Sequence, residues 1–229
     1  DGLPLAVPGV MVVNYVDDPR IRLPREDGTR RPRHDVTCIV VHSTLGAPDR
    51  DFPHPQTLIP GKGPSTDLGR ALTEMWGTDH RCAGAHAGVD HDGVVYCLQD
   101  MLLWESYHAT NVNARSIGIE YRQGRKQSEF YGVQLVAGRI FAIWNAVYFG
   151  VQRMVPKVYR GHPSARLANG AKDFYGIFGH RDQSNDRGIG DPGDFIINSF
   201  KPYCEVFDID ANEDLDTWSK RQKWLGFTG

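Results

Sequence analysis

Two short apolar runs that each end in a histidine constrain the fold of this chain most strongly. The first run, at 38–42, reads CIVVH, and the second, at 177–180, reads IFGH. Runs of Val, Ile and Phe without polar alternation are typical of strands that are buried on both faces of a sheet. Helical patterns lie between such runs, so the sequence predicts an α/β domain in which α-helices flank a central mixed β-sheet.

The expected elements follow from periodicity and from turn residues. We expect strands at 37–42, 84–89, 94–99, 116–121 and 177–180, and helices at 67–76 and 129–149. In the longer helix a broad apolar face is predicted to pack on the sheet, and Gly150 is predicted to end the helix. That face consists of Phe130, Val133, Leu135, Val136, Ile140, Ile143, Trp144, Val147 and Tyr148.

Length and composition favour one domain with attached segments. A chain of 229 residues, of which 40% are hydrophobic, is long enough to bury a full core. We expect an irregular arm at 1–36, the domain at 37–205, and a tail at 206–229 that carries an amphipathic helix. Within the domain, a segment at 43–83 that is rich in Pro and Gly is interpreted as an insertion.

The charge pattern argues against a protein dedicated to nucleic-acid binding. The net charge is −2, and the densest basic patch, at 30–34, is short and interrupted by proline. Such a patch is typical of a solvated loop. No apolar stretch approaches the ~20 residues that cross a bilayer, so no membrane span is predicted.

The four cysteines form no C-x-x-C pair, which argues against a structural zinc site of the cysteine type. Cys82 and Cys97 bracket an expected hairpin that turns at 90–93, and this register places His86 opposite Cys97. The two sulfurs would then lie about 13 Å apart along the strand, too far for a disulfide. We therefore predict free thiols, and we expect His86 to be a hydrogen-bonded interior histidine rather than a metal ligand.

His42, His180 and Asp191 are candidates for a three-ligand zinc site. Two imidazoles and one carboxylate leave a fourth position for water, as catalytic zinc sites do. Nine histidines also allow accidental pairs, and a histidine that follows a strand is often a core or surface residue. Pro192 favours Asp191 because proline holds the preceding residue in an extended conformation. Three nearby acidic residues compete for the third position: Asp182, Asp186 and Asp194.

Four segments of the chain carry a more specific pattern. They read IVVHST at 39–44, AHAGVDHDGVVY at 85–96, YHA at 107–109 with SIGIE at 116–120, and GHRD at 179–182 with DPG at 191–193. In this order they resemble the type 2 N-acetylmuramoyl-L-alanine amidase family, which includes peptidoglycan recognition proteins and small phage amidases. Each motif alone is weak, and their common order and spacing over about 36–200 make the resemblance specific.

The resemblance implies that the three candidate ligands bind zinc in a surface groove. It also implies that Glu120 is the general base, which takes a proton from water and delivers it to the leaving amine. In the alternative interpretation, Glu120 is a surface glutamate that pairs with Arg115 or Arg122.

The resemblance further implies substrate contacts close to these motifs. The family counterpart of His108 lines the groove. The aromatic rings close to the motifs can stack on a sugar, although aromatic residues beside strands are often core residues. These rings belong to Trp76, Trp104, Tyr107 and Tyr121. Many family members carry a lysine two residues before the last ligand, where it stabilises the oxyanion, but this chain has Ile189 there. Arg187 is the nearest replacement, and the alternative is that zinc alone stabilises the oxyanion.

Together these residues imply zinc-dependent hydrolysis of the amide bond between N-acetylmuramic acid and L-alanine in peptidoglycan. The alternatives are a recognition module that binds muropeptide without cleaving it, and a zinc hydrolase that cuts another amide in the stem peptide. Such a substrate places the protein in the periplasm, at the cell wall or outside the cell, as a mature secreted protein or a phage lysin. The tail at 215–226 is similar to the first helix of a small peptidoglycan-binding module, or is a terminal helix that docks on the core. Stem-peptide preference and oligomeric state stay open.

Overall fold

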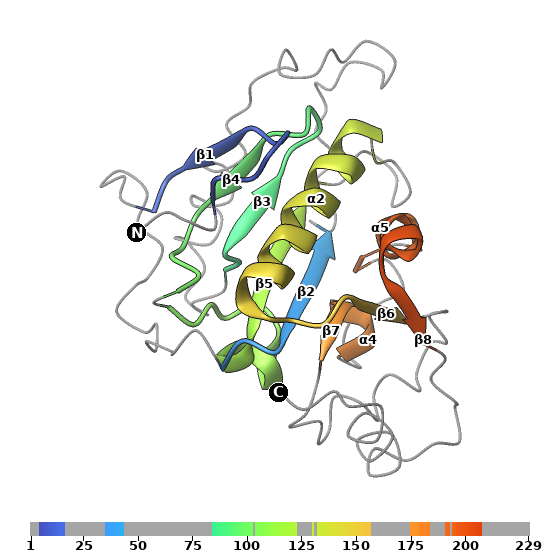
Figure 1. Ribbon diagram of the computed structural model, residues 1–229. Helices are drawn as coiled ribbons and strands as arrows, with labels where there is room; N and C mark the ends of the chain where they lie inside the picture. Colours follow the sequence, from blue (N-terminus) through green and yellow to red (C-terminus); the bar gives the residue numbers. More distant parts are fainter. Residues whose placement is uncertain are drawn as a thin grey trace, which may run out of the picture.

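A computed structural model of the chain describes the parts that carry most of these motifs (Figure 1). The described residues are 5–16, 35–43, 84–102, 104–122, 130, 132–156, 175–183, 191–192 and 194–207. Their elements confirm the predicted α/β architecture, a mixed central sheet with flanking helices.

The main sheet has six strands in the order β1-β4-β3-β5-β2-β7. The strands are β1 (Val12–Asn14), β2 (Cys38–Ser43), β3 (Ala87–Val89), β4 (Val95–Cys97), β5 (Ser116–Tyr121) and β7 (Gly176–Gly179). Only the β3–β4 pair is antiparallel, and the other four neighbouring pairs are parallel. The two apolar runs that end in histidine are therefore neighbours, β2 and β7, at one side of the sheet.

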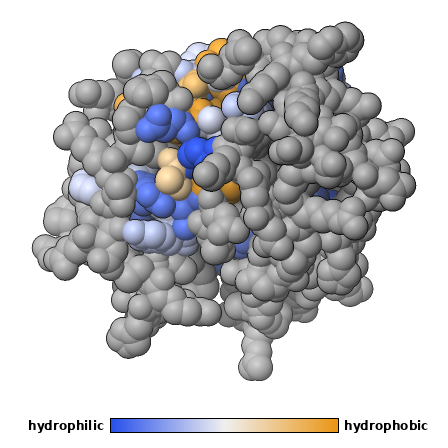
Figure 2. Space-filling view, turned by 90° about the horizontal axis from the view of Figure 1, so that it is seen from below, coloured by the Kyte–Doolittle hydropathy of each residue, from blue (hydrophilic) through white to orange (hydrophobic). Residues whose placement is uncertain are grey.

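The remaining elements lie around this sheet. They are the 3₁₀-helices η5 (Thr110–Arg115) and η6 (Lys201–Tyr203), the helices α2 (Gly132–Phe149), α4 (His180–Gln183) and α5 (Asp194–Phe200), and the strands β6 (Met154–Pro156) and β8 (Glu205–Phe207). The last two strands form a separate parallel pair. Seen from below, the described surface alternates between polar and apolar areas (Figure 2).

The two faces of the sheet have different contents because side chains alternate along each strand. Odd-numbered residues of the central strands, such as Ile39 and Ile119, belong to the main hydrophobic core together with Phe141 of α2. Even-numbered residues, such as His42 and Glu120, point to the opposite face. Figure 1 shows α2 lying along the first face of the sheet. The candidate chemistry therefore lies on the face that α2 does not cover.

The predicted buried face of α2 is partly right. Five of its residues pack, partly buried, against the core: Phe130, Leu135, Ile140, Ile143 and Tyr148. The fully buried side chains, however, include Phe141, Ala142 and Ala146, whereas Val136, Trp144 and Val147 are 43%, 38% and 64% exposed. Close approach contributes to this, because a Cβ on Gly138 would clash with the Tyr121 phenol. Because α2 is apolar on most sides, its periodicity alone did not identify the buried face.

The predicted end of α2 is confirmed. The helix ends at Phe149, and Gly150 follows it with a φ of 75°. Glycine adopts this left-handed conformation without the steric cost that a Cβ adds, as is typical of the residue after a helix.

The hairpin register differs from the prediction by one residue. Ala87, and not His86, lies opposite Cys97, because the turn has three residues and ends at Gly93 with a φ of 81°. His86 and Cys97 therefore point to opposite faces of the sheet. Among the described cysteines, Cys38, Cys97 and Cys204 are free thiols, as predicted, and burial raises the pKa of Cys97. Cys82 lies outside the described residues.

The predicted segment boundaries need two corrections. The arm at 1–36 is not wholly irregular, because its apolar residues form β1, which pairs with β4 at the sheet edge. The tail does not start at 206, because β8 continues to Phe207 through its pairing with β6. The predicted helices at 67–76 and 215–226 and most of the insertion at 43–83 lie outside the described residues.

One described helix, α2, is long and apolar enough to cross a membrane by length and composition. The contacts of α2 with β2, β3, β4 and β5 account for much of its apolar character, because a helix on a sheet needs an apolar face. The absence of a membrane span stays a prediction.

Candidate active site

Three side chains meet where β2 and β7 end. The parallel strands pair Val41 with Gly179, so the residues that follow them, His42 and His180, lie side by side at the carboxyl edge of the sheet. Asp191 joins them from the loop that precedes α5. One ligand atom from each of the three buried side chains lies within 4.8 Å of the others. The structure therefore brings together the three predicted metal ligands.

The geometry of this cluster suits a zinc ion. The Nδ1 atom of His180 lies 3.0 Å from one carboxylate oxygen of Asp191, and the Nδ1 atom of His42 lies 3.7 Å from the other. Ligand atoms around a tetrahedral zinc ion are about 3.3 Å apart, given bonds of about 2.0–2.1 Å. The Nε2 atom of His180 is buried and has no hydrogen-bond partner among the described residues. Two imidazoles and a carboxylate are also the donor types that zinc accepts.

Backbone groups hold the third ligand in place. The Ser43 N–H donates to a carboxylate oxygen of Asp191 at 3.1 Å, and the Arg181 N–H donates to the Asp191 carbonyl at 2.6 Å. Burial raises the pKa of Asp191, but the neighbouring His180 and His42 side chains and the Ser43 N–H together lower it. Asp191 is therefore held as the carboxylate, which is the form that binds a metal.

The other candidate for the third ligand that the structure describes has a different role. Asp182 accepts a hydrogen bond from the Gly179 N–H at 2.8 Å, so it caps the start of α4 beside His180. Asp186 and the side chain of Asp194 lie outside what the structure describes.

Glu120 lies beside this cluster. It pairs in register with His42 on the neighbouring strand, and its carboxylate lies 3.9 Å from the Nδ1 atom of His42. The Glu120 side chain is 14% exposed, so solvent reaches it. The alternative partner Arg122 instead contacts Asp90 at 3.2 Å. This position suits a carboxylate that exchanges protons with a water molecule at the cluster.

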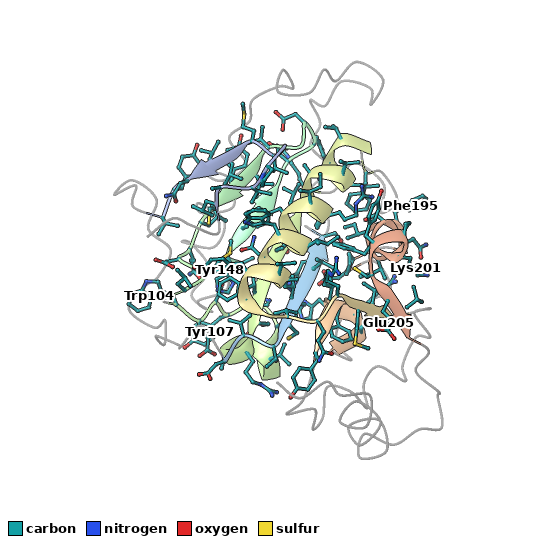
Figure 3. All side chains as sticks on the ribbon, viewed as in Figure 1. Trp104, Tyr107, Tyr148, Phe195, Lys201 and Glu205 are labelled. Carbon is teal, nitrogen blue, oxygen red and sulfur yellow. The ribbon has the colours of Figure 1, made fainter. Side chains whose placement is uncertain are left out.

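His108 lies on the other side of His42. Its Nδ1 atom is 2.9 Å from the Nε2 atom of His42, and its Nε2 atom is 3.0 Å from the Ser116 hydroxyl. Both ring nitrogens therefore have partners within the protein. Tyr107 is 36% exposed. In Figure 3, Tyr107 and Trp104 lie at the same side of the view. Tyr121, in contrast, is fully buried and therefore cannot stack on a substrate, and Trp76 lies outside the described residues.

His86 is an interior histidine, as predicted. It is fully buried, its Nδ1 atom accepts the Gly118 N–H at 3.0 Å, and its Nε2 atom lies 3.1 Å from the Trp104 carbonyl. The carbonyl can only accept, so the proton of His86 is on Nε2. This histidine connects β5 to the segment that carries Trp104 and is not part of the metal cluster.

A comparison with protein families decides the identity of the domain. The sequence profile described as N-acetylmuramoyl-L-alanine amidase matches residues 32–194. The chain belongs to this amidase family. The match includes both strands that end in histidine, Glu120 and the Asp191 loop, so the four motifs and the profile agree. Comparison with curated proteins gives no significant match.

Solved structures of the amidase fold show the same architecture at low sequence identity. A mutant of Drosophila PGRP-LB in complex with tracheal cytotoxin is 15% identical, with a TM-score of 0.55 over 86% of this chain and 96% of that chain. Bumblebee PGRP-SA is 13% identical, with a TM-score of 0.54 over 86% and 98% of the two chains. A mutant endolysin from Bacillus subtilis is 15% identical, with a TM-score of 0.50 over 84% and 97%. These likenesses support the amidase fold.

Two polar residues of this amidase domain were not assigned a role from the sequence. Ser116 contacts His108, and the side-chain oxygen of Asn113 accepts the N–H groups of His108 and Ala109 at 3.1 and 2.6 Å. Ser116 is the first residue of the SIGIE motif, but a serine at the start of a strand does not indicate which side chain its hydroxyl will contact. Arg187 and Ile189 lie outside the described residues, so the oxyanion role of Arg187 stays a prediction.

Proposed function

We propose that this protein hydrolyses the amide bond between N-acetylmuramic acid and L-alanine in peptidoglycan, with zinc as its cofactor. The observation that carries the proposal is the buried cluster of His42, His180 and Asp191 with Glu120 beside it, in a chain of the amidase family. A zinc ion in such a cluster acidifies water and polarises a carbonyl group.

The position of Glu120 supports its proposed task. Glu120 accepts a proton from the attacking water and donates it to the leaving amine, since it is close to His42 and partly exposed to solvent. Tyr107 and Trp104 are proposed to contact the glycan or the peptide. Arg187 is proposed to stabilise the oxyanion in place of the lysine that Ile189 replaces. A peptidoglycan substrate places this work in the periplasm, at the cell wall or outside the cell.

A second candidate function is binding of muropeptides without cleavage. It is favoured by Ile189, which cannot donate a hydrogen bond to an oxyanion, and by the similar fold of PGRP-LB, a protein solved with tracheal cytotoxin. Loss of one oxyanion donor typically lowers the rate by about 10²–10³. A slow amidase and a pure binder therefore differ in whether any product accumulates over long incubation.

The test is digestion of purified peptidoglycan, with mass spectrometry of the soluble products and zinc content measured in parallel. The wild type should release peptides that begin at L-alanine, and Glu120→Gln should lose about 10²-fold or more of this rate while retaining zinc. Glu205→Gln is the matched control, because Glu205 is an exposed strand glutamate in β8, outside the cluster. Muropeptides that stay intact with the zinc-loaded wild type would favour the binder, and cuts within the stem peptide would overturn the proposed bond.

A further inference from the structure

Four histidines lie in a row across the face of the sheet that α2 does not cover. In the order His86, His108, His42 and His180, the neighbouring ring centroids are 5.8, 5.1 and 4.6 Å apart. The row begins at a structural histidine and ends at a predicted metal ligand. His108 is the member whose role the proposed mechanism leaves open.

The hydrogen bonds of His108 have one consistent direction. The Nδ1 atom of His42 faces Asp191 and Glu120, so it is the atom available to a metal and must be unprotonated. The proton of His42 is then on Nε2, which donates to the Nδ1 atom of His108 at 2.9 Å. His108 in turn carries its own proton on Nε2 and donates to the Ser116 hydroxyl at 3.0 Å.

The surrounding structure is built to hold the His108 ring in this position. A Cβ on Gly118 would lie 2.5 Å from the Cγ atom of His108, so the ring occupies the space that a side chain on β5 would fill. The backbone of His108 is fixed as well, because Asn113 accepts its N–H. Ser116 is fully buried, so its hydroxyl is shielded from bulk water.

We infer that His108 and Ser116 are positioning residues, which fix the tautomer and the ring orientation of His42 and thereby strengthen metal binding. A histidine ligand commonly donates its second ring N–H to a fixed acceptor, and loss of this acceptor typically weakens metal binding by about 10–100-fold. His108 supplies the acceptor, and Ser116 keeps its proton on the nitrogen that faces away from His42. The inference rests on the proposed metal site and is independent of which amide is cut.

The test measures Zn²⁺ affinity by competition with a chromophoric chelator, together with the visible absorption of the Co²⁺-loaded protein. His108→Leu keeps a bulky side chain but removes the acceptor, so it should bind Zn²⁺ about 10–100-fold more weakly and change the Co²⁺ spectrum. His108→Asn should restore most of the affinity, since its amide oxygen can lie close to the position of Nδ1 and accept from His42.

Ser116→Ala and Ser106→Ala form a matched pair of variants that tests the hydrogen bond between His108 and Ser116. Both serines are fully buried, but the Ser106 hydroxyl donates to the Gly84 carbonyl. The contact of Ser106 with His108 is through its main-chain carbonyl, which accepts the His108 N–H and is kept in Ser106→Ala. We expect weaker Zn²⁺ binding from Ser116→Ala and unchanged binding from Ser106→Ala. This pair also carries the test if His108→Leu fails to fold, which thermal melting in chelator would reveal.

Two results would overturn the inference, and they have different consequences. If His108→Leu and Ser116→Ala fold and bind Zn²⁺ as tightly as the wild type, the positioning role is wrong and the proposed amidase is unaffected. If the wild type itself binds no Zn²⁺, the metal site and the proposed function both fail.

Discussion

Gly118 shows at the scale of one residue how the site constrains the sequence. Its missing side chain makes room for the His108 ring, so Gly118→Ala forces either the ring or β5 to move. We expect a loss of about 1–3 kcal/mol in the free energy of unfolding, as in other overpacked cores, measured by urea denaturation in chelator. In a His108→Ala background the same change should cost less, because the clashing ring is absent. An equal cost in both backgrounds would contradict this explanation.

At this scale, the sequence predicts those parts of the candidate site whose chemistry only a few residue types can supply. His42, His180 and Asp191 were found because zinc ligands are restricted to a few residue types, and the structure places them together. The partners of His108 were not found, because a serine and an asparagine fit many environments equally well. The roles of Ser116 and Asn113 follow only from the register of β5 and from the path of the preceding segment.

At the scale of elements, the close contact between α2 and β5 predicts that Gly138 cannot be enlarged without loss of stability. By helix propensity alone, Gly138→Ala should stabilise α2 by about 1 kcal/mol, but the new Cβ clashes with the Tyr121 phenol. We expect a net loss of stability in denaturant titrations. Gly132→Ala is the control in the same helix, since a Cβ there meets nothing within 4 Å, and it should leave stability unchanged or higher. Equal effects at the two positions would show that α2 does not lie this close to the strand.

The elements themselves could be predicted far better than their orientations. Strand β5 lies at the predicted residues, and β2 is displaced from its prediction by one residue. The buried face of α2 was only partly predicted because the helix is apolar on most sides. The hairpin register was wrong because the residues at 90–93 do not by themselves fix the turn length. In the structure Asp90 pairs with Val94, which leaves a three-residue turn.

At the scale of the whole molecule, metal binding should increase the free energy of unfolding and the Tm. The three predicted ligands come from β2, from the start of α4 and from Asp191, so a bound zinc ion would cross-link segments that are far apart in the chain. Zinc at 100 times its Kd adds about 2.7 kcal/mol, which for a domain of this size raises Tm by about 5–10 °C. Calorimetry should show this shift with Zn²⁺, a much smaller one with Mg²⁺, and none with Zn²⁺ in His180→Ala. A full Zn²⁺ shift in His180→Ala would place the metal elsewhere.

The order of the strands in space differs from their order in the chain, and this has a consequence for biosynthesis. Strand β2 is made early, yet its outer neighbour β7 follows all of the other strands of the main sheet. A nascent chain that has emerged only as far as α2 holds Glu120 and one of the three ligands. The predicted metal site is therefore completed only after residue 191 leaves the ribosome, and a chain truncated before that point lacks at least one of the three predicted ligands.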